Sequence, residues 1–414
     1  MNSFLPNVTI LFLIIVFVGF FNEQVTHLTY EIALLLFSVL IGAVIAVIWA
    51  YSKDESVRSL VDTVQVFDIE KFLMKGVLCF MLFAGSRNLK LGDFKKDAKP
   101  VTVLSLLCTL LGAVFYGALF YLVSKALGFS FTLPMCMMAG SIVAPTDPIA
   151  ATSILQKFGL PEEIDFLIEA ESLFNDGVGV ALFVCFSGMV TASSSAGFFT
   201  IMLREILGAF VVGVVTSWVA FRVILHTDDV HRRVFATILA VASAYLICER
   251  LDFSGAIASV ICGITFSALR DRHSDRMSDM TGFDSFWDMI DVLLNSVLYV
   301  IMGLTFVRII QMPRVAVLSL AAIILNFIAR YGSVFVGSCM LHPLPAGYTR
   351  GRFSMLFTWG GLRGGLGIAL AMSTVGMLST DQYHIILGMV YAIVFFTTVI
   401  QGLSMKKVYE KISK

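Results

Sequence analysis

Charged residues are scarce in this chain of 414 residues, and the two signs cancel. Lysine and arginine together number 29, as do aspartate and glutamate, so charged residues form 14% of the sequence and the formal net charge is zero. Basic residues gather only in short stretches between apolar segments, and the sequence offers nothing that would follow a phosphate backbone. We therefore expect no nucleic-acid partner.

Histidine and cysteine are also few, and their spacing matches neither a metal site nor a disulfide framework. The chain has six histidines and seven cysteines. No histidine lies at the centre of an apolar stretch, and no cysteine takes part in CxxC or His–Cys spacing. No nucleophile motif is visible either. These absences favour a protein that is not an enzyme and that carries no cofactor.

Apolar residues, by contrast, make up 58% of the sequence. A helix that crosses a bilayer needs about 20 mostly apolar residues, and thirteen stretches qualify, some of them interrupted. They are residues 6–21, 30–50, 68–85, 100–124, 131–156, 164–188, 198–222, 232–250, 254–270, 286–310, 314–340, 351–376 and 382–405. The predicted fold class is an all-α polytopic membrane protein with about 13 transmembrane helices. The first stretch lacks a basic flank and a cleavage site, so we interpret it as a retained span.

Lysine and arginine are concentrated in alternate connections between these stretches. One set of connections is rich in them, whereas the loop "GMVTASSSAGFFT" carries no charge. Because basic residues remain on the cytoplasmic side, we predict a plasma-membrane protein with its N-terminus outside and its C-terminus in the cytoplasm. The basic residues behind this prediction are Arg87, Lys90, Lys95, Lys96, Lys99, Arg222, Arg232, Arg233, Arg270, Arg272, Arg276, Arg350, Arg352, Lys406, Lys407, Lys411 and Lys414.

Thirteen spans divide into six, one and six, which gives two halves of opposite orientation. Such inverted repeats are typical of secondary transporters. The fifth member of each half is interrupted. In 131–156, Pro145 and Pro148 lack a backbone N–H and free carbonyls in the preceding turn; in 351–376, a run of glycines weakens the helix. Proline and glycine are also common in membrane helices as ordinary kinks, but two breaks at matching positions favour a binding site.

Charged side chains inside the predicted spans are each a functional hypothesis, because an unpaired charge at that depth is costly. In 164–188, Glu171 and Asn175 share a helical face, and Ser172 lies over Asn175 and Asp176. We expect this stripe to face the interrupted span, where Thr146 and Asp147 supply further oxygen atoms.

Oxygen ligands of these kinds suit a hard cation. We predict a site for a hard monovalent or divalent cation, formed by Asp176, Asp147, Ser172 and Thr146 together with freed carbonyls. Since a buried carboxylate without its cation tends to hold a proton, the two ions would compete for the same oxygen atoms. Alternatively, Asp147 is a helix cap before Pro148, and the two hydroxyls bond to their own helices.

Two arginines stand out near the middle of predicted spans. Arg330, in "NFIARYG", has no acidic neighbour in its own segment, and we predict an ion pair with Glu171, which leaves Asp176 as the free carboxylate of the stripe. Arg363 is expected to have a structural role. It either satisfies the carbonyl ends of the half-helices or helps to neutralise Asp147.

Three motifs occur in a characteristic order: "APTDP", "EAESLFNDGVG" and "WGGLRGGLGIAL", with a lone arginine in the span before the last. This combination resembles the sodium/proton antiporters of the first monovalent cation:proton antiporter family, over nearly the whole chain. The resemblance implies that Asp176 alternately holds cation and proton and that Asn175 positions it. It also implies that Thr146, Asp147 and Ser172 complete a Na⁺ site with Asp176, and that Glu171 and Arg330 form a stabilising pair.

The same resemblance implies a homodimer with one transmembrane transport domain over residues 1–414. Residues 1–99 and 198–311 would be mainly scaffold and dimer interface, and residues 100–197 and 312–405 mainly a mobile ion-binding core with crossed, partly unwound helices. Residues 406–414 would be a short cytoplasmic tail.

Two positions modify what the resemblance implies. In electrogenic relatives, a second aspartate occupies the position of Asn175 in this chain. The resemblance therefore implies one-for-one, electroneutral exchange here. Many relatives carry a glutamate where this chain has Phe83, so a role assigned to that glutamate does not transfer.

Other transport functions remain open at this point. The ligand types do not distinguish Na⁺ from K⁺ or Li⁺. A carrier of another solute, such as an organic anion, would require positive charge at the site, which Asp147 and Asp176 disfavour. A cation channel could also use buried carboxylates, although channels usually place them on a symmetry axis.

Overall fold

The computed structural model describes residues 4–51, 78–87, 98–147, 151, 155, 159–191, 198–273, 280–310 and 313–413. Pro148 and the predicted start of the third span lie outside these ranges. Within them the chain is helical, apart from connecting segments and one isolated backbone bridge. Helices satisfy their own backbone hydrogen bonds, as a segment in lipid must.

Nine helices in the described part of the chain are long and apolar enough to cross a membrane. The chain is therefore a multi-pass helical membrane protein. These nine segments are Val8–Thr26, Tyr30–Ile48, Ala98–Ala126, Glu162–Thr191, Leu203–Ile224, Val230–Arg250, Thr281–Phe306, Val315–Ser338 and Thr380–Ser413.

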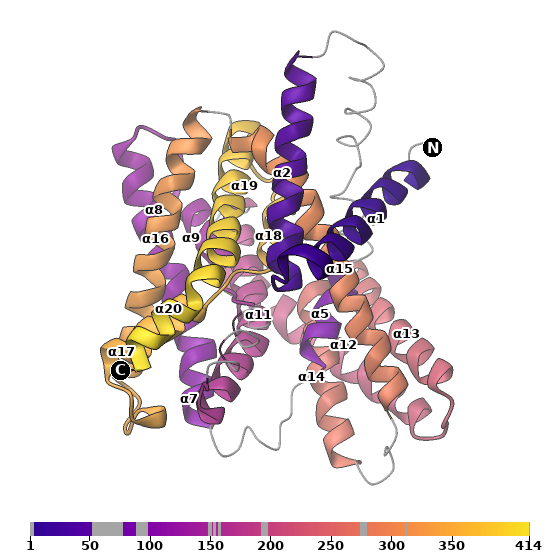
Figure 1. The fold of residues 1–414 in the computed structure, drawn as a ribbon. Helices are drawn as coiled ribbons and strands as arrows, with labels where there is room; N and C mark the ends of the chain where they lie inside the picture. Colours follow the sequence, from indigo (N-terminus) through magenta and orange to yellow (C-terminus); the bar gives the residue numbers. More distant parts are fainter. Residues whose placement is uncertain are drawn as a thin grey trace.

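One group of helices lies together on one side of the molecule (Figure 1). Aromatic side chains form much of its core. Phe83, Phe266 and Trp287 are buried there, and the rings of Phe83 and Trp287 lie 4.6 Å apart. Phe83, expected at the position where many relatives carry a glutamate, is thus part of an aromatic core. The helices of this group are α5 (Leu78–Ser86), α12 (Phe198–Ile224), α13 (Val230–Arg250), α14 (Gly255–Arg272) and α15 (Thr281–Ile310).

The N-terminal helices join this group through α15. The chain forms α1 (Phe4–Phe21), η1 (Asn22–Thr26) and α2 (Tyr30–Tyr51), and α2 packs along α15. A Cβ on Gly42 would lie only 2.6 Å from the carbonyl oxygen of Gly303. The two backbones therefore touch, which is how small residues hold membrane helices together.

The remaining helices form a second group, whose outer members α8, α16, α17 and α20 lie on the other side of Figure 1. Helix α11 packs against α9, and α16 packs against α8, α17 and α19. The elements of this group are α7 (Ala98–Thr102), η3 (Val103–Cys108), α8 (Thr109–Ala126), α9 (Leu133–Val143), α11 (Glu162–Thr191), α16 (Pro313–Ser338), η7 (Pro345–Gly347), α17 (Arg350–Gly360), α18 (Gly365–Met372), α19 (Thr380–Phe395), η8 (Phe396–Gln401) and α20 (Gly402–Ser413).

Two helices of this group are interrupted, and the interruptions touch. Helix α9 ends at Val143, and the following residues up to Asp147 are not helical; helix α17 ends at Gly360, and α18 begins at Gly365. The backbone N–H of Asp147 donates to the carbonyl oxygen of Leu362 at 2.8 Å, which forms an isolated antiparallel bridge. The two breaks therefore meet within the second group of helices.

The last helix extends beyond the predicted end of the last span. The apolar pattern predicts that this span ends at residue 405, but the helix continues to Ser413. Tyr409 and Ile412 are buried, and the Tyr409 hydroxyl donates to the carbonyl oxygen of Gly159 at 3.1 Å. Apolar residues repeat on one face of this segment and pack against the second group, so residues 406–413 are a docked helical end.

Candidate functional site

Arginine side chains satisfy the carbonyl groups that the two interruptions leave open. A continuous helix would pair the carbonyl of Phe357 with the N–H of Gly361, but α17 ends first. Arg330 on α16 instead donates to the Phe357 oxygen through Nη2 at 3.3 Å. Similarly, Arg363 donates through Nη1 to the carbonyl oxygens of Ala144 and Pro145, at 2.5 and 2.8 Å.

Arg363 is fixed by further contacts around the α17–α18 break. Its Nη2 donates to Asn326 Oδ1 on α16 at 3.1 Å. Its backbone N–H donates to the Thr397 hydroxyl, and its carbonyl oxygen accepts from the Thr398 hydroxyl, each at 3.1 Å. Arg363 is 5% exposed. These contacts correspond to the first of the two roles expected for this residue, the satisfaction of freed backbone groups.

Glu171 on α11 and Arg330 on α16 form a buried ion pair. Arg330 Nη1 lies 2.6 Å from Glu171 Oε1, and Nη2 donates to Oε2 at 2.9 Å. The side chains are only 2% and 4% exposed. This hydrogen bond and the second close N···O contact hold the two charged groups together. A Cβ on Gly361 would lie 3.0 Å from Arg330 Nε, so glycine at this position gives the guanidinium its room.

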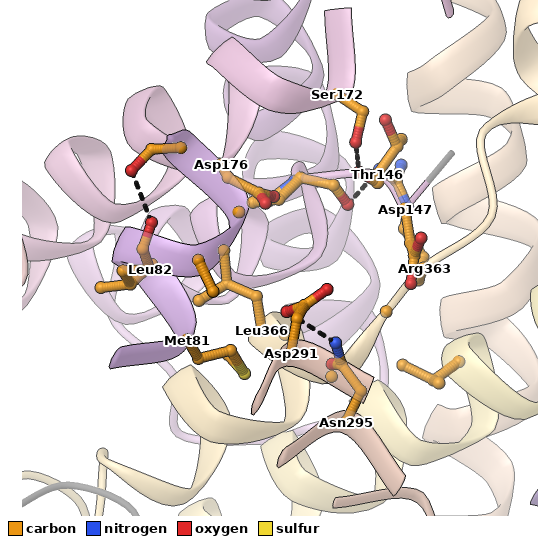
Figure 2. Close-up of a pocket in the computed structure, with 18 of the residues that line it drawn as sticks. Met81, Leu82, Thr146, Asp147, Ser172, Asp176, Asp291, Asn295, Arg363 and Leu366 are labelled. Atoms are coloured by element: carbon orange, nitrogen blue, oxygen red, sulfur yellow. Dashed lines mark hydrogen bonds between the residues drawn. The ribbon is translucent and has the colours of Figure 1, made fainter. Parts of the chain in front are cut away.

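Asn175, Ser172 and Thr146 bind α11 to the interruption after α9. The Thr146 N–H donates to Asn175 Oδ1 at 3.2 Å, and Asn175 Nδ2 donates to Thr146 Oγ1 at 2.8 Å. The Ser172 hydroxyl donates to the carbonyl oxygen of Thr146. All three residues are buried, and the stripe on α11 does face the interrupted segment (Figure 2).

Pro145 packs directly on α11 at this point. A Cβ on Gly179 would lie 2.2 Å from Pro145 Cγ, so only a glycine lets the interrupted segment come this close. This contact also holds the break after α9 against helix α11.

Asp147 and Asp176 line a common cavity of about 510 Å³ at the crossing. Both side chains are half-buried. A Cβ on Gly364 would lie 2.7 Å from Asp147 Oδ2, so this carboxylate lies against the N-terminal end of α18, where exposed N–H groups favour negative charge. Tyr299 on α15 donates to the same oxygen at 3.5 Å.

The donor set at the cavity consists of oxygen atoms. Two carboxylates, from Asp147 and Asp176, lie beside the hydroxyl groups of Thr146 and Ser172. In the described residues, no three His, Cys, Asp or Glu side chains converge as they would for a bound metal. Oxygen donors of these kinds suit a hard cation.

Several residues around the cavity were not anticipated from the sequence. Asn326, Thr397 and Thr398 hold Arg363, and no local pattern identifies them. On α15, three polar residues line the cavity: Asp288, Asp291 and Asn295. Their spacing of three and four residues places them on one helical face, and charges within or beside a predicted span are a signal that sequence reasoning could have used.

The chain is similar to proteins of a known transporter family. A family model described as "Sodium/hydrogen exchanger, transmembrane" matches residues 8–411. The Na(+)/H(+) antiporter NhaP of Pseudomonas aeruginosa is 29% identical over 369 residues, which cover 85% of this chain and 83% of that protein. The Na(+)/H(+) antiporter NhaH of Halobacillus dabanensis is 29% identical over 342 residues, or 80% of this chain and 81% of that one.

Among solved structures, the sodium proton antiporter MjNhaP1 of Methanocaldococcus jannaschii, determined at pH 8, has the same fold. Its TM-score is 0.77 at 21% identity, and the match covers 99% of both chains. From the extent of the family match, the chain belongs to the transmembrane sodium/hydrogen exchanger family.

Proposed function

We propose that this protein is a secondary active Na⁺/H⁺ antiporter that contributes to pH homeostasis. The relatives at 29% identity are named Na(+)/H(+) antiporters, and the cavity provides oxygen ligands of the type that Na⁺ requires. One observation carries the proposal: Asp147 and Asp176 line one cavity at the crossing of two interrupted helices.

Several other polar groups at the crossing have structural contacts. Glu171 is neutralised by Arg330, and Arg363 donates to backbone carbonyl oxygens. Asn175 uses its amide to hold Thr146. Asp176 is then the group that binds either a proton or Na⁺, with Asp147, Thr146 and Ser172 as the other ligands and Asn175 as a positioning residue.

Competition gives coupling in the following way. A carboxylate surrounded by protein is costly as a bare anion, so Asp176 is occupied by one ion or the other whenever the core moves. Loading Na⁺ expels the proton, and loading the proton expels Na⁺. Alternating access then exchanges the two ions across the membrane, with one site exposed to one side at a time.

The wider architecture that we propose follows the family resemblance. It has about 13 transmembrane helices in two inverted six-helix repeats, with the N-terminus outside and the C-terminus in the cytoplasm, in the plasma membrane. Residues 100–197 and 312–405 form the mobile core. Residues 1–99 and 198–311 form the scaffold, which contacts the lipid bilayer and pairs in a homodimer. No cofactor takes part.

Exchange is expected to be electroneutral, because Asn175 is an amide that releases no proton. A single titrating carboxylate exchanges one proton for one Na⁺, and the rate should then be independent of membrane potential. The measurement uses proteoliposomes with a preset pH gradient, in which valinomycin and K⁺ clamp the voltage at zero or at a negative value inside. Equal Na⁺-driven proton fluxes are expected; a flux that changes with the clamped voltage would contradict one-for-one exchange.

The same proteoliposomes identify the cation and distinguish exchange from conduction. Na⁺, K⁺ and Li⁺ are added in separate experiments. We expect Na⁺ to dissipate the pH gradient at a lower concentration than K⁺ or Li⁺. A preference for K⁺ or Li⁺ would retain the mechanism and change the substrate. Cation uptake that proceeds without proton movement would show a channel and overturn the proposal.

A further inference from the structure

A polar face of α15 leads from one end of the helix to the candidate cation site. Asp284, Asp288, Asp291, Asn295 and Tyr299 follow one another at intervals of three or four residues, so they share one side of the helix. Helix α15 packs with the first group of helices, across the cavity from α11 and the interrupted segment.

The outer acids of this face are held by arginines. Arg87, which is 1% exposed, lies 2.7 Å from Asp284 Oδ1 and 2.5 Å from Asp288 Oδ1. Arg270 lies 2.7 Å from Asp284 Oδ2. These two acids are therefore already neutralised and have a structural role between α5, α14 and α15.

Asp291 differs from its neighbours on α15. Its carboxylate accepts a hydrogen bond from Asn295 Nδ2 at 3.2 Å, and among the described residues no Lys, Arg or His lies within ion-pair distance of it. The side chain is half-buried and lines the cavity that Asp147 and Asp176 also line. Figure 2 shows Asp291 and Asn295 on one side of this cavity, with Thr146, Ser172 and Asp176 on the other.

Two features of α15 connect Asp291 with the ion site. Asn295 orients the Asp291 carboxylate from one turn further along. Its own Oδ1 lies against the start of α18, 2.7 Å from the position that a Cβ on Gly365 would take. One turn beyond, Tyr299 donates to Asp147. The same helical face therefore reaches from Asp291 to an expected cation ligand.

We propose that Asp291 is a cation-positioning residue of the transport path. Its carboxylate holds Na⁺ in the cavity before Asp147 and Asp176 bind it, and again after they release it. An unpaired carboxylate in a partly desolvated cavity attracts a cation more strongly than one in open water. This inference depends on the proposed antiport function, and it adds a ligand on α15, outside the crossed helices.

The test compares Asp291→Asn, Asp291→Glu and wild type in proteoliposomes, with initial rates measured over a range of Na⁺ concentrations at one fixed pH. Removing the charge should raise the KM for Na⁺ about tenfold, while the maximal rate stays within about twofold of wild type. Glu should restore most of the affinity. Glu410→Gln removes an exposed carboxylate outside the cavity and should leave both parameters unchanged.

A second variant covers the case in which Asp291→Asn does not fold. Asn295→Ala keeps the carboxylate but removes the donor that orients it, and should also raise KM without lowering the maximal rate. An unchanged KM in both variants, an equal loss of maximal rate in the Asn and Glu variants, or a rise in KM in Glu410→Gln would overturn the inference. Failure of wild type to exchange any cation for protons would instead overturn the proposed function.

Discussion

Replacing Asp176 with asparagine is expected to abolish Na⁺/H⁺ exchange and leave only the leak of empty vesicles. The amide has nearly the same shape, but it neither releases a proton nor carries the charge that balances Na⁺. Of the two carboxylates at the crossing, Asp176 lies on α11 beside Asn175 and Ser172, the residues that join this helix to the interrupted segment. Na⁺-driven dissipation of a preset pH gradient in proteoliposomes measures the effect.

Glu162→Gln is a matched control for this substitution. It removes a carboxylate from the same helix at an exposed position outside the cavity, and its exchange rate should equal that of wild type. Wild-type exchange in Asp176→Asn, with the variant reconstituted to the same level, would show that another group carries the proton.

Replacing Arg330 with methionine should cause the largest loss of stability. It leaves the Glu171 carboxylate, 2% exposed, without its counter-ion and leaves the Phe357 oxygen without its donor. Breaking a buried pair in this way costs about 3–5 kcal/mol of folding free energy. Thermal unfolding of the purified protein in detergent measures the change.

The double variant Glu171→Leu with Arg330→Met separates a structural role from a transport role. Without either charge, most of the lost stability should return, and Na⁺/H⁺ exchange should return with it, because the pair itself binds no transported ion. A double variant as stable as wild type that fails to exchange would place Glu171 or Arg330 in the ion path. Arg232→Met, which breaks the exposed pair with Asp229 at 3.6 Å, should change the unfolding temperature little.

Much of the site follows from sequence because burying a charge is costly. Arg330 requires an acidic partner from another span, and pairing it with Glu171 leaves Asp176 available for ions. In the structure, Arg330 and Glu171 are in contact. Helical spacing likewise put Asn175 and Ser172 on one face, and the interrupted segment lies against that face. Pro145 and the glycines around Arg363 marked the two breaks, because they weaken helices by covalent structure alone.

Other features depend on tertiary paths that no local pattern encodes. Thr397 and Thr398 satisfy the backbone of Arg363 only because η8 passes beside the break. Tyr299 donates to Asp147 because α15 passes close to the interrupted segment after α9. Asp291 falls within the predicted span 286–310, but it lies near the start of that span. An acid at such a position is also explained by contact with solvent. The roles predicted for Pro148 and for the other residues outside the described ranges remain predictions.

Proton release on Na⁺ binding tests most directly whether one carboxylate holds either ion but not both. Purified protein in weakly buffered detergent solution is titrated with NaCl in the presence of a pH-sensitive dye, and Na⁺ binding is measured in parallel by calorimetry. Wild type should release close to one proton for each Na⁺ bound, and Asp176→Asn should release none. Na⁺ binding to wild type without proton release would contradict the account.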